Sequence, residues 1–392
     1  MPIYRREGEI PPKRHTQFRR PDGGLYYEEL IGTEGFSGIS SLVYHLRRPT
    51  QVRSARRLGP VVYEASEPGP LRHRHVRTRR IPEGGDPWTA RRPLFWNADV
   101  VISVARPTQS SETFFRDSQG EELIYVSEGS GALESIFGDL PYGKGDYLVI
   151  PRGTIHRFRC DPVPHHLLVV ESRGHVRTPK RYRNSFGQLL EHSPFCERDI
   201  RTPRFREPRD ETGEFEIRVK QGDAIHAYLY AAHPFDAIGW DGYYYPWAMQ
   251  ISDFEPITGR IHQPPPVHQT FEGDGFVVCS FVPRLYDYHP DSIPTPYHHA
   301  NLGSEEILYY ASDRFMSRKG IEHGSITLHP DGLPHGPHPG TIEASLGARE
   351  TDELAVMIDT FRPLTVGREA EAIEDESYLT SWLEPGDRPS GG

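Results

Sequence analysis

The sequence is poor in the features that mark disulfide-rich, membrane or nucleic-acid-binding proteins. It has only three cysteines among 392 residues, too few for a disulfide scaffold or a cysteine-rich zinc site. It has no run of 18 apolar residues, so we expect no transmembrane helix. Its N-terminus, MPIYRREGEIPPKRH, lacks the apolar stretch of a secretory signal. Its net charge of −10 argues against nucleic acid as the main partner. These absences predict a cytoplasmic protein with a small-molecule partner.

Turn formers and histidine, by contrast, are abundant. Glycine and proline number 37 each and punctuate short apolar stretches, a pattern typical of strands and tight turns. Few segments show the 3.6-residue apolar period of a helix, so we predict an all-β fold. The 20 histidines, in a chain with so few cysteines, favour a metal held by nitrogen and oxygen ligands.

The predicted strands fall into two series that are separated by a polar connector. The first series begins with DVVISVAR and the second with AIHAYLYAA. Together they predict two related β-domains. The predicted organisation is an N-terminal arm with leading strands (1–98), a first barrel (99–175), a connector (176–222), a second barrel (223–370) and a tail (371–392).

An arginine-rich segment at 71–92 contains His73 and His75, which have the spacing of two metal ligands. Five arginines lie within 71–80 and would repel a cation. We therefore interpret this segment as a basic strip that is exposed or contacts another subunit.

One pattern occurs twice and carries most of the functional argument. GDYLVIPRGTIH begins at Gly145 and GSITLHPDGLPH at Gly324, and both follow G-x5-P-x-G-x2-H. The pattern predicts a strand, a Pro/Gly turn and an inward histidine. It resembles the second motif of the cupin superfamily, whose members are double-stranded β-helix barrels. The duplication implies a two-domain, bicupin-like arrangement with an N-terminal extension.

The partner motif of cupins supplies histidines and a glutamate, and PYHHANLGSEEILYY stands at the corresponding place. His299, Glu305 and His335 form a candidate two-histidine, one-carboxylate set, which suits Fe(II) and leaves positions for substrate and O2. His298 and Glu306 are the adjacent competitors. Because neighbours in a strand face opposite ways, only one of each pair can be a ligand.

Other histidines receive supporting roles or none. His329, inside the second copy of the repeat, and Asn301 are candidates for contacts that orient the ligands. The first copy is preceded by EELIYVSEGSGALES, which has no histidine. We therefore expect the first barrel to be metal-free and His156 to be structural.

Four segments together resemble the homogentisate 1,2-dioxygenase family: HPFDAIGWDGYYYPW, RIHQPPPVHQTF, PYHHANLGSE and LPHGPHPG. The resemblance implies an Fe(II) enzyme that opens homogentisate (2,5-dihydroxyphenylacetate) with O2 to maleylacetoacetate, in tyrosine and phenylalanine breakdown. It implies His299, Glu305 and His335 as ligands and His262 as the acid/base, with His268 as runner-up. It also implies a homo-oligomer.

The sequence departs from that family around the substrate. Arg314 falls where the family has a tyrosine that helps to hold the substrate carboxylate, and an arginine can bind a carboxylate through two hydrogen bonds. It can equally lie on an outward strand. Tyr310 and Tyr309 are further candidates for substrate contacts, as is His335. The alternatives are a related dioxygenase acting on gentisate or another hydroquinone, and a non-oxygenase cupin.

Overall fold

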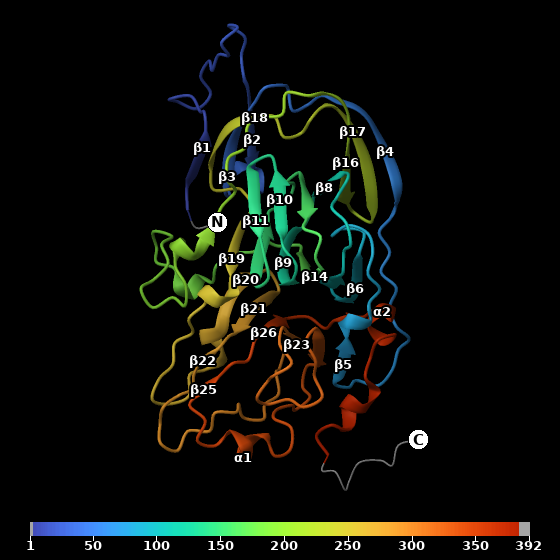
Figure 1. The fold of residues 1–392 in the computed structure, drawn as a ribbon, viewed down its shortest axis with the longest axis vertical. Coiled ribbons are helices and arrows are strands. Elements are labelled where there is room, and N and C mark those ends of the chain that lie inside the picture. Colours follow the sequence, from blue (N-terminus) through green and yellow to red (C-terminus); the bar gives the residue numbers. More distant parts are fainter. Residues whose placement is uncertain (1–2, 384–392) are drawn as a thin grey trace.

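The computed structural model describes residues 3–383, and almost all of its regular structure is strand (Figure 1). This confirms the all-β prediction. The helices are single turns that lie in connections, as expected where Gly and Pro interrupt the chain. They are α1 (Thr341–Ser345), α2 (Arg368–Glu371) and the 3-10 turns η1 (Glu34–Phe36), η2 (Thr78–Arg80), η3 (Lys180–Tyr182), η4 (Glu197–Asp199), η5 (Ile251–Asp253), η6 (Pro265–His268) and η7 (Glu376–Thr380).

Two large sheets enclose the first core. Alternate residues of both sheets face each other and bury a cluster that includes Leu133, Phe158, Ile124 and Val169. The first sheet runs β11 (Gly138–Tyr142), β10 (Gly131–Ser135), β13 (His156–Cys160), β8 (Phe114–Asp117), β16 (Thr212–Gln221), β17 (Ala224–Ala232) and β4 (Val52–Pro60). The second runs β15 (Ile200–Arg201), β19 (Trp247–Gln250), β12 (Asp146–Ile150), β9 (Glu121–Glu128), β14 (His166–Ser172), β7 (Val100–Ala105), β6 (Arg91–Trp96) and β27 (Thr365–Val366).

A six-stranded sheet builds the second core. Leu308, Tyr310 and Met357 on one face form a small apolar cluster. On the opposite face, Ile307 and Tyr309 join the large core that connects the two halves. The sheet runs β20 (Gln269–Gly273), β21 (Phe276–Phe281), β26 (Ala355–Thr360), β23 (Glu305–Tyr310), β24 (Ser325–His329) and β5 (Arg74–Arg77), and beside it β22 (Arg284–Leu285) pairs with β25 (Glu350–Thr351).

The N-terminal residues are distributed over four sheets instead of forming a separate arm. Three of their strands make a small sheet with β18 (Ala237–Gly242), and the others extend the sheets of both cores. Pairing across distant parts of the chain thus joins segments 1–98 and 223–370. The small sheet runs β1 (Arg5–Gly8), β18, β3 (Ser40–His45) and β2 (Tyr27–Gly32).

The central part of the basic segment at 71–92 is buried within the chain, so the prediction of an exposed strip is wrong, while the contact with another subunit stays a prediction. β5 is an edge strand of the six-stranded sheet and pairs with β24, so Figure 1 shows it, in blue, in the lower half of the molecule. His73 and His75 are buried. The arginines are tolerated because carboxylates from the C-terminal segment neutralise them: Glu374 pairs with Arg72 and Arg74, and Asp375 with Arg77.

The two copies of the repeat have matching backbone conformations. Gly145 and Gly324 have φ of 88° and 86°, and Gly153 and Gly332 have φ of 78° and 77°. These left-handed values favour glycine. The histidine that ends each copy also makes the same contact, its Nδ1 lying 3.0 Å from the Thr154 carbonyl in one copy and 3.2 Å from the Leu333 carbonyl in the other.

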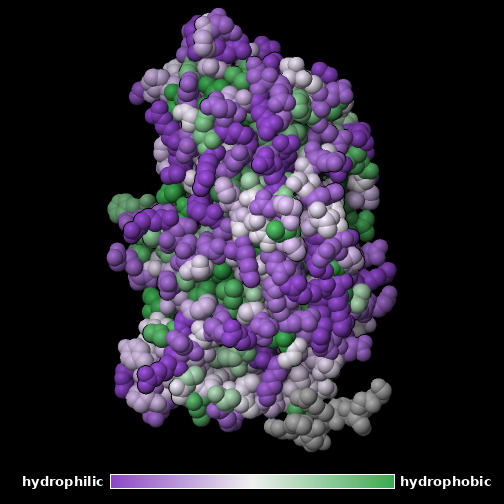
Figure 2. Space-filling view, viewed as in Figure 1, coloured by the Kyte–Doolittle hydropathy of each residue, from purple (hydrophilic) through white to green (hydrophobic). Residues whose placement is uncertain are grey.

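The face of the molecule seen in Figure 2 is largely hydrophilic, with hydrophobic residues scattered in small groups. Within residues 3–383, no helix has the length and apolar character needed to span a bilayer. The predicted tail, 371–392, lies partly outside the described residues. As far as Leu383 it packs on the second barrel, where Trp382 donates a hydrogen bond to the carbonyl of Gly336 at 2.9 Å.

Candidate metal centre

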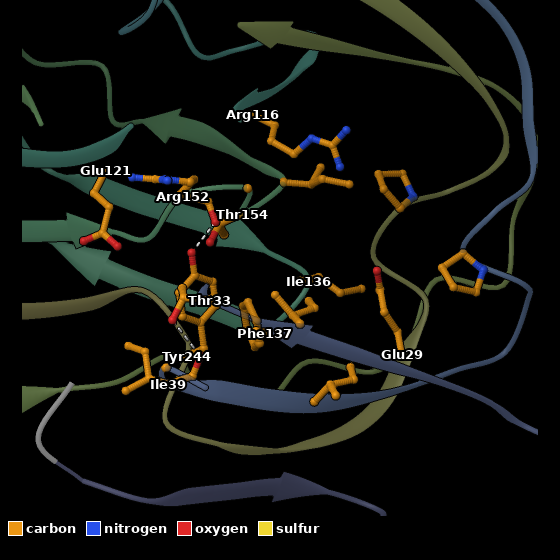
Figure 3. A pocket seen from close by; sticks show the side chains of 18 of the residues that line it. Glu29, Thr33, Ile39, Arg116, Glu121, Ile136, Phe137, Arg152, Thr154 and Tyr244 are labelled. Carbon is orange, nitrogen blue, oxygen red and sulfur yellow. Dashed lines mark hydrogen bonds between the residues drawn. The ribbon is translucent and has the colours of Figure 1, made fainter. Parts of the chain in front are cut away.

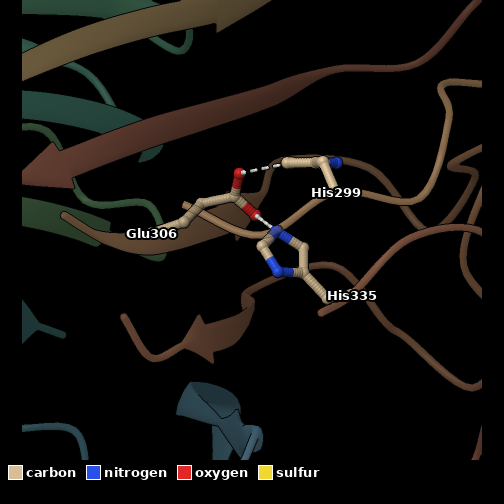
Figure 4. A group of neighbouring side chains, drawn as sticks. All are labelled: His299, Glu306 and His335. Atoms are coloured by element: carbon tan, nitrogen blue, oxygen red, sulfur yellow. Dashed lines mark ion pairs between the residues drawn. The ribbon is translucent and has the colours of Figure 1, made fainter. Parts of the chain in front are cut away.

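Two histidines and a glutamate converge at the open end of the second barrel (Figure 4). A two-residue bridge holds the histidines together, since the backbone N–H of His299 and of His335 each donates to the other's carbonyl at 2.8 Å. Their ring centroids lie 4.3 Å apart. The Glu306 carboxylate reaches between them, 3.5 Å from His335 Nε2 and 4.0 Å from His299 Nε2.

Hydrogen bonds fix which nitrogen each histidine offers. His299 Nδ1 lies 3.1 Å from the carbonyl of Tyr297, and His335 Nδ1 lies 3.2 Å from that of Leu333. Since a carbonyl can only accept, Nδ1 carries the proton and Nε2 presents a lone pair. His335 Nε2 is buried and has no hydrogen-bond partner among residues 3–383. Such an unpartnered nitrogen beside a carboxylate fits a metal ligand.

The structure brings Glu306, and not Glu305, to this centre. Both lie in β23, where successive side chains face opposite ways. The Glu305 carboxylate points to the other face and accepts a hydrogen bond from the Leu364 backbone N–H at 2.7 Å. The three donors therefore include the competitor in place of the predicted glutamate, while His299 and His335 lie where the sequence placed them.

His329 supports Glu306 from behind. Its Nδ1 lies 2.6 Å from Glu306 Oε1, and its Nε2 lies 3.0 Å from the Tyr378 hydroxyl. Burial lowers the pKa of His329 to about 3, so it is neutral, with Nδ1–H donating and Nε2 accepting. Burial opposes ionisation of Glu306, but the hydrogen bond from His329 and the neighbouring His335 imidazole hold the pKa of Glu306 well below the usual range. The carboxylate is therefore charged and oriented.

Other contacts reinforce the same region. Asn301 accepts a backbone hydrogen bond from Gly332 at 2.8 Å and lines the cavity in front of the centre. His73 Nε2 lies 3.1 Å from the Pro334 carbonyl, and its ring contacts those of His329 and His335.

Asp359 lies opposite Glu306 on β26. Its burial and the charge of Glu306 raise the pKa of Asp359 to about 8.

A cavity of about 660 Å³ opens in front of His299 and Glu306. This volume is in the range of small-molecule sites. The side chains of Phe281, Phe315 and Met357 give it apolar walls, and the Arg318 guanidinium supplies a cation.

Arg318 is buried and forms no ion pair with any described residue. Burial disfavours its charge, but neighbouring Tyr378, Tyr310 and Glu306 raise its pKa, so it stays protonated.

Both predicted acid/base candidates line this cavity. His262 is half exposed, and its Nδ1 lies 3.6 Å from Asp287 Oδ2. Asp287 is itself fixed by the backbone N–H groups of Gly259 and Gln263, each at 3.1 Å. His268 is buried against Phe281, and this burial lowers its pKa to about 3. His262 is thus the more accessible of the two.

The predicted substrate contacts Arg314 and Tyr310 lie away from the cavity. Arg314 is on the outside, with a side chain 76% exposed, and pairs with Asp352 at 2.7 Å. Tyr310 shares the inward face of Glu306 but lies deeper in the barrel, where its hydroxyl is 3.2 Å from Thr327 Oγ1. A one-residue offset from Glu305 to Glu306 moves the counted position from Arg314 to Phe315, which lines the cavity together with Arg318.

In the first barrel, basic side chains stand among the acidic groups. Asp117, Glu122 and Glu171 cluster near His156. Arg91 Nη1 lies 2.8 Å from Glu122 and 2.6 Å from Glu171, and Lys220 also contacts Glu171. These cations supply the positive charge that the buried carboxylates require.

Several residues of the site gave little signal in the sequence. Arg318 and Tyr378 belong to no recognisable motif, and His73 comes from a segment more than 200 residues away. His262 lies in the loop before η6, and Asp287 lies in a separate loop after β22. Only the alternation of β23 could have pointed to Glu306, since its inward face continues through Leu308 and Tyr310.

The chain is similar to proteins of known class. Residues 97–251 match the model of the homogentisate 1,2-dioxygenase N-terminal region. A Saccharolobus solfataricus protein, provisionally named a dioxygenase, is 41% identical over 385 residues, 97% of this chain and 99% of that protein.

Relatives named homogentisate 1,2-dioxygenase are more distant. The protein from Nitrobacter hamburgensis is 28% identical and that from Bradyrhizobium diazoefficiens 26% identical. Each alignment spans 68% of this chain and 62% of the relative. Among solved structures, a cupin barrel protein from Leptotrichia buccalis aligns over 78% of this chain with 9% identity and a TM-score of 0.32. The sequence relationships show that this chain belongs to the homogentisate 1,2-dioxygenase family.

Proposed function

We propose that this protein is an Fe(II)-dependent dioxygenase that opens the ring of a hydroquinone carboxylic acid, with homogentisate as substrate, maleylacetoacetate as product and tyrosine and phenylalanine catabolism as its setting. The observation that carries the proposal is the set of two imidazole nitrogens and one carboxylate beside a cavity that contains Arg318, a buried arginine without an ion-pair partner among the described residues. This donor set suits Fe(II).

In this proposal His299, Glu306 and His335 hold the metal, and His329 keeps the Glu306 carboxylate in place. When bound, Fe(II) supplies a centre on which a ring oxygen and O2 are held together and exchange electrons. The Nδ1–H groups of His299 and His335 stay on backbone carbonyls, so both rings keep their orientation.

The cavity residues position the substrate. Arg318 pairs with the carboxylate, which gives a buried cation the partner it lacks. The apolar walls pack against the ring and exclude water. His262 accepts a phenolic proton at Nε2, because its Nδ1 faces Asp287. The deprotonated ring is richer in electrons and is the better reductant for O2.

Oxygen uptake by the iron-loaded protein tests this function. We expect one O2 consumed for each homogentisate, with the absorbance of a ring-opened maleyl product. No uptake with homogentisate, gentisate or plain hydroquinone would refute the dioxygenase proposal. Uptake with gentisate alone would favour the second candidate, a gentisate-type enzyme, since Arg318 would serve either acid.

A further inference from the structure

A second cavity, of about 730 Å³, lies in the other half of the molecule (Figure 3). It lies between the small N-terminal sheet and the seven-stranded sheet, and it shares no lining residue with the cavity at the metal centre. Figure 3 shows Arg116 from β8 on one wall and Glu29 from β2 on another. Its volume is suitable for a small molecule.

The charge of the cavity is opposite in sign to that of the chain. Six arginines line it, against five carboxylates, although the protein as a whole has a net charge of −10. Four of the carboxylates already have basic partners. His45 binds Glu29 and Asp236, His175 binds Glu121, and Arg177 binds Asp274.

Four of the arginines, in contrast, have no carboxylate partner among the described residues. They are Arg48, whose guanidinium lies over the ring of Tyr27, and Arg116, Arg152 and Arg173. Arg152 donates only to the backbone carbonyl of Arg173, which brings two cations to the same rim. Arg116 is half buried beside Tyr230, and its Nε has no hydrogen-bond partner. The buried Oγ1 of Thr154 also lacks a partner. A partly buried cation such as Arg116 is costly without an anion beside it.

The remaining wall is apolar and aromatic. Ile136, Phe137 and Ile155 line it together with Tyr244, whose hydroxyl donates to the Arg152 carbonyl. Inorganic phosphate or a polyphosphate would place charged oxygens against these apolar side chains, which is unfavourable. A carboxylate attached to a ring or short carbon chain would place its anion on the arginines and its apolar part on Ile136 and Phe137.

We propose that this cavity is a second binding site, separate from the metal centre, for a small organic carboxylic acid. Arg116 binds the carboxylate, Arg152 and Arg173 add positive charge at the rim, and the wall of Ile136 and Phe137 holds the apolar body.

Calorimetric titration of the full chain with phenylacetate and with its uncharged counterpart phenylacetamide tests the proposal. Arg116→Met removes the cation, Arg116→Lys keeps the charge, and Arg314→Met is the matched control at an exposed arginine outside both cavities. Arg318→Met serves to remove binding at the metal-centre cavity.

We expect saturable phenylacetate binding that persists in R318M and R314M, weakens at least tenfold in R116M and is partly retained in R116K. Phenylacetamide should bind at least tenfold more weakly than phenylacetate. Equal affinity in wild type and R116M, loss of all binding in R318M, or no saturation by roughly 10 mM would overturn the proposal. Binding of inorganic phosphate without binding of phenylacetate would also overturn it.

If R116M does not fold, as judged by circular dichroism, R173M replaces it, because Arg173 is exposed at the rim. The same tenfold weakening is expected, and an unchanged affinity in R173M contradicts the proposal. Because the proposal does not depend on iron, its failure is distinguishable from failure of the ring-cleavage function.

Discussion

At the scale of single residues, one carboxylate decides the candidate centre. Glu306 reaches the lone-pair nitrogens of His299 and His335, whereas Glu305 accepts a backbone hydrogen bond on the opposite face. Replacing each of the two glutamates in turn by glutamine distinguishes the metal ligand from the adjacent carboxylate. We expect Glu306→Gln to abolish tight iron binding and turnover, and Glu305→Gln to leave both within about threefold. Metal analysis after anaerobic reconstitution measures the difference; iron retained by E306Q and lost by E305Q would reverse the assignment.

Tyr378 acts on the same carboxylate through His329. Tyr378→Phe removes the hydroxyl that donates to His329 Nε2, so the imidazole and Glu306 lose an orienting contact. We expect iron affinity to fall by about tenfold and stability by about 1 kcal/mol. Tyr147→Phe is the matched control, because it removes a buried hydroxyl bonded to Ser280 at 2.8 Å, away from the metal centre. A fall in iron affinity of the same size in Y147F would mean that Tyr378 has no specific role.

The sequence predicted some of these site residues and missed others. His299 and His335 lie in motifs with fixed spacing, so both positions were predictable. Glu305 and Glu306 are adjacent acids, and only the register of β23 tells them apart. Arg314 was chosen by counting from the wrong glutamate, and Arg318 reaches the cavity through a loop whose path no local pattern encodes. Tertiary packing, and not a local sequence pattern, determines which of these side chains reach the site.

At the scale of structural elements, the repeated turn offers an internal comparison. Gly153 and Gly332 have almost identical positive φ, and a Cβ at either would meet no atom within 4 Å. Alanine at each position therefore costs mainly backbone strain, roughly 1–2 kcal/mol. Only Gly332 donates a hydrogen bond to Asn301 beside the metal ligands. We expect both variants to lose similar stability, but only Gly332→Ala to bind iron more weakly. Equal iron affinities in the two variants would disprove a link between this turn and the centre.

The small N-terminal sheet contains a buried, charged histidine that links its strands. His45 lies 2.7 Å from Asp236 and 3.0 Å from Glu29. Burial opposes its charge, but these carboxylates raise the pKa of His45 to about 9. The folded state therefore holds a proton that the unfolded chain releases near pH 6.5.

This raised pKa predicts a pH dependence of stability. The contribution of His45 is fully present below pH 6.5 and is lost as the pH rises through about 9. We expect urea unfolding to show a decrease of up to about 3 kcal/mol across that window, and His45→Gln to flatten it. A wild-type protein whose stability is constant from pH 6.5 to 9 would contradict this assignment.

At the scale of the whole molecule, the sequence predicted which segments form strands better than it predicted which strands pair with each other. The repeat and the short apolar stretches between glycines and prolines were sufficient for an all-β fold. They could not show that β5, at 74–77, completes a sheet of strands from 269–360, or that its arginines are neutralised by Glu374 and Asp375. Such pairings depend on residues about 300 positions apart. The metal centre therefore includes support from both ends of the chain, through His73 and Tyr378.

The most direct test of the central claim is a crystal structure of the iron-reconstituted protein, with anomalous scattering recorded at the iron edge. The account predicts a single strong peak within coordination distance of Nε2 of His299, Nε2 of His335 and a carboxylate oxygen of Glu306. A peak at Glu305, a peak among Asp117, Glu122 and Glu171, or no bound iron after reconstitution would contradict it.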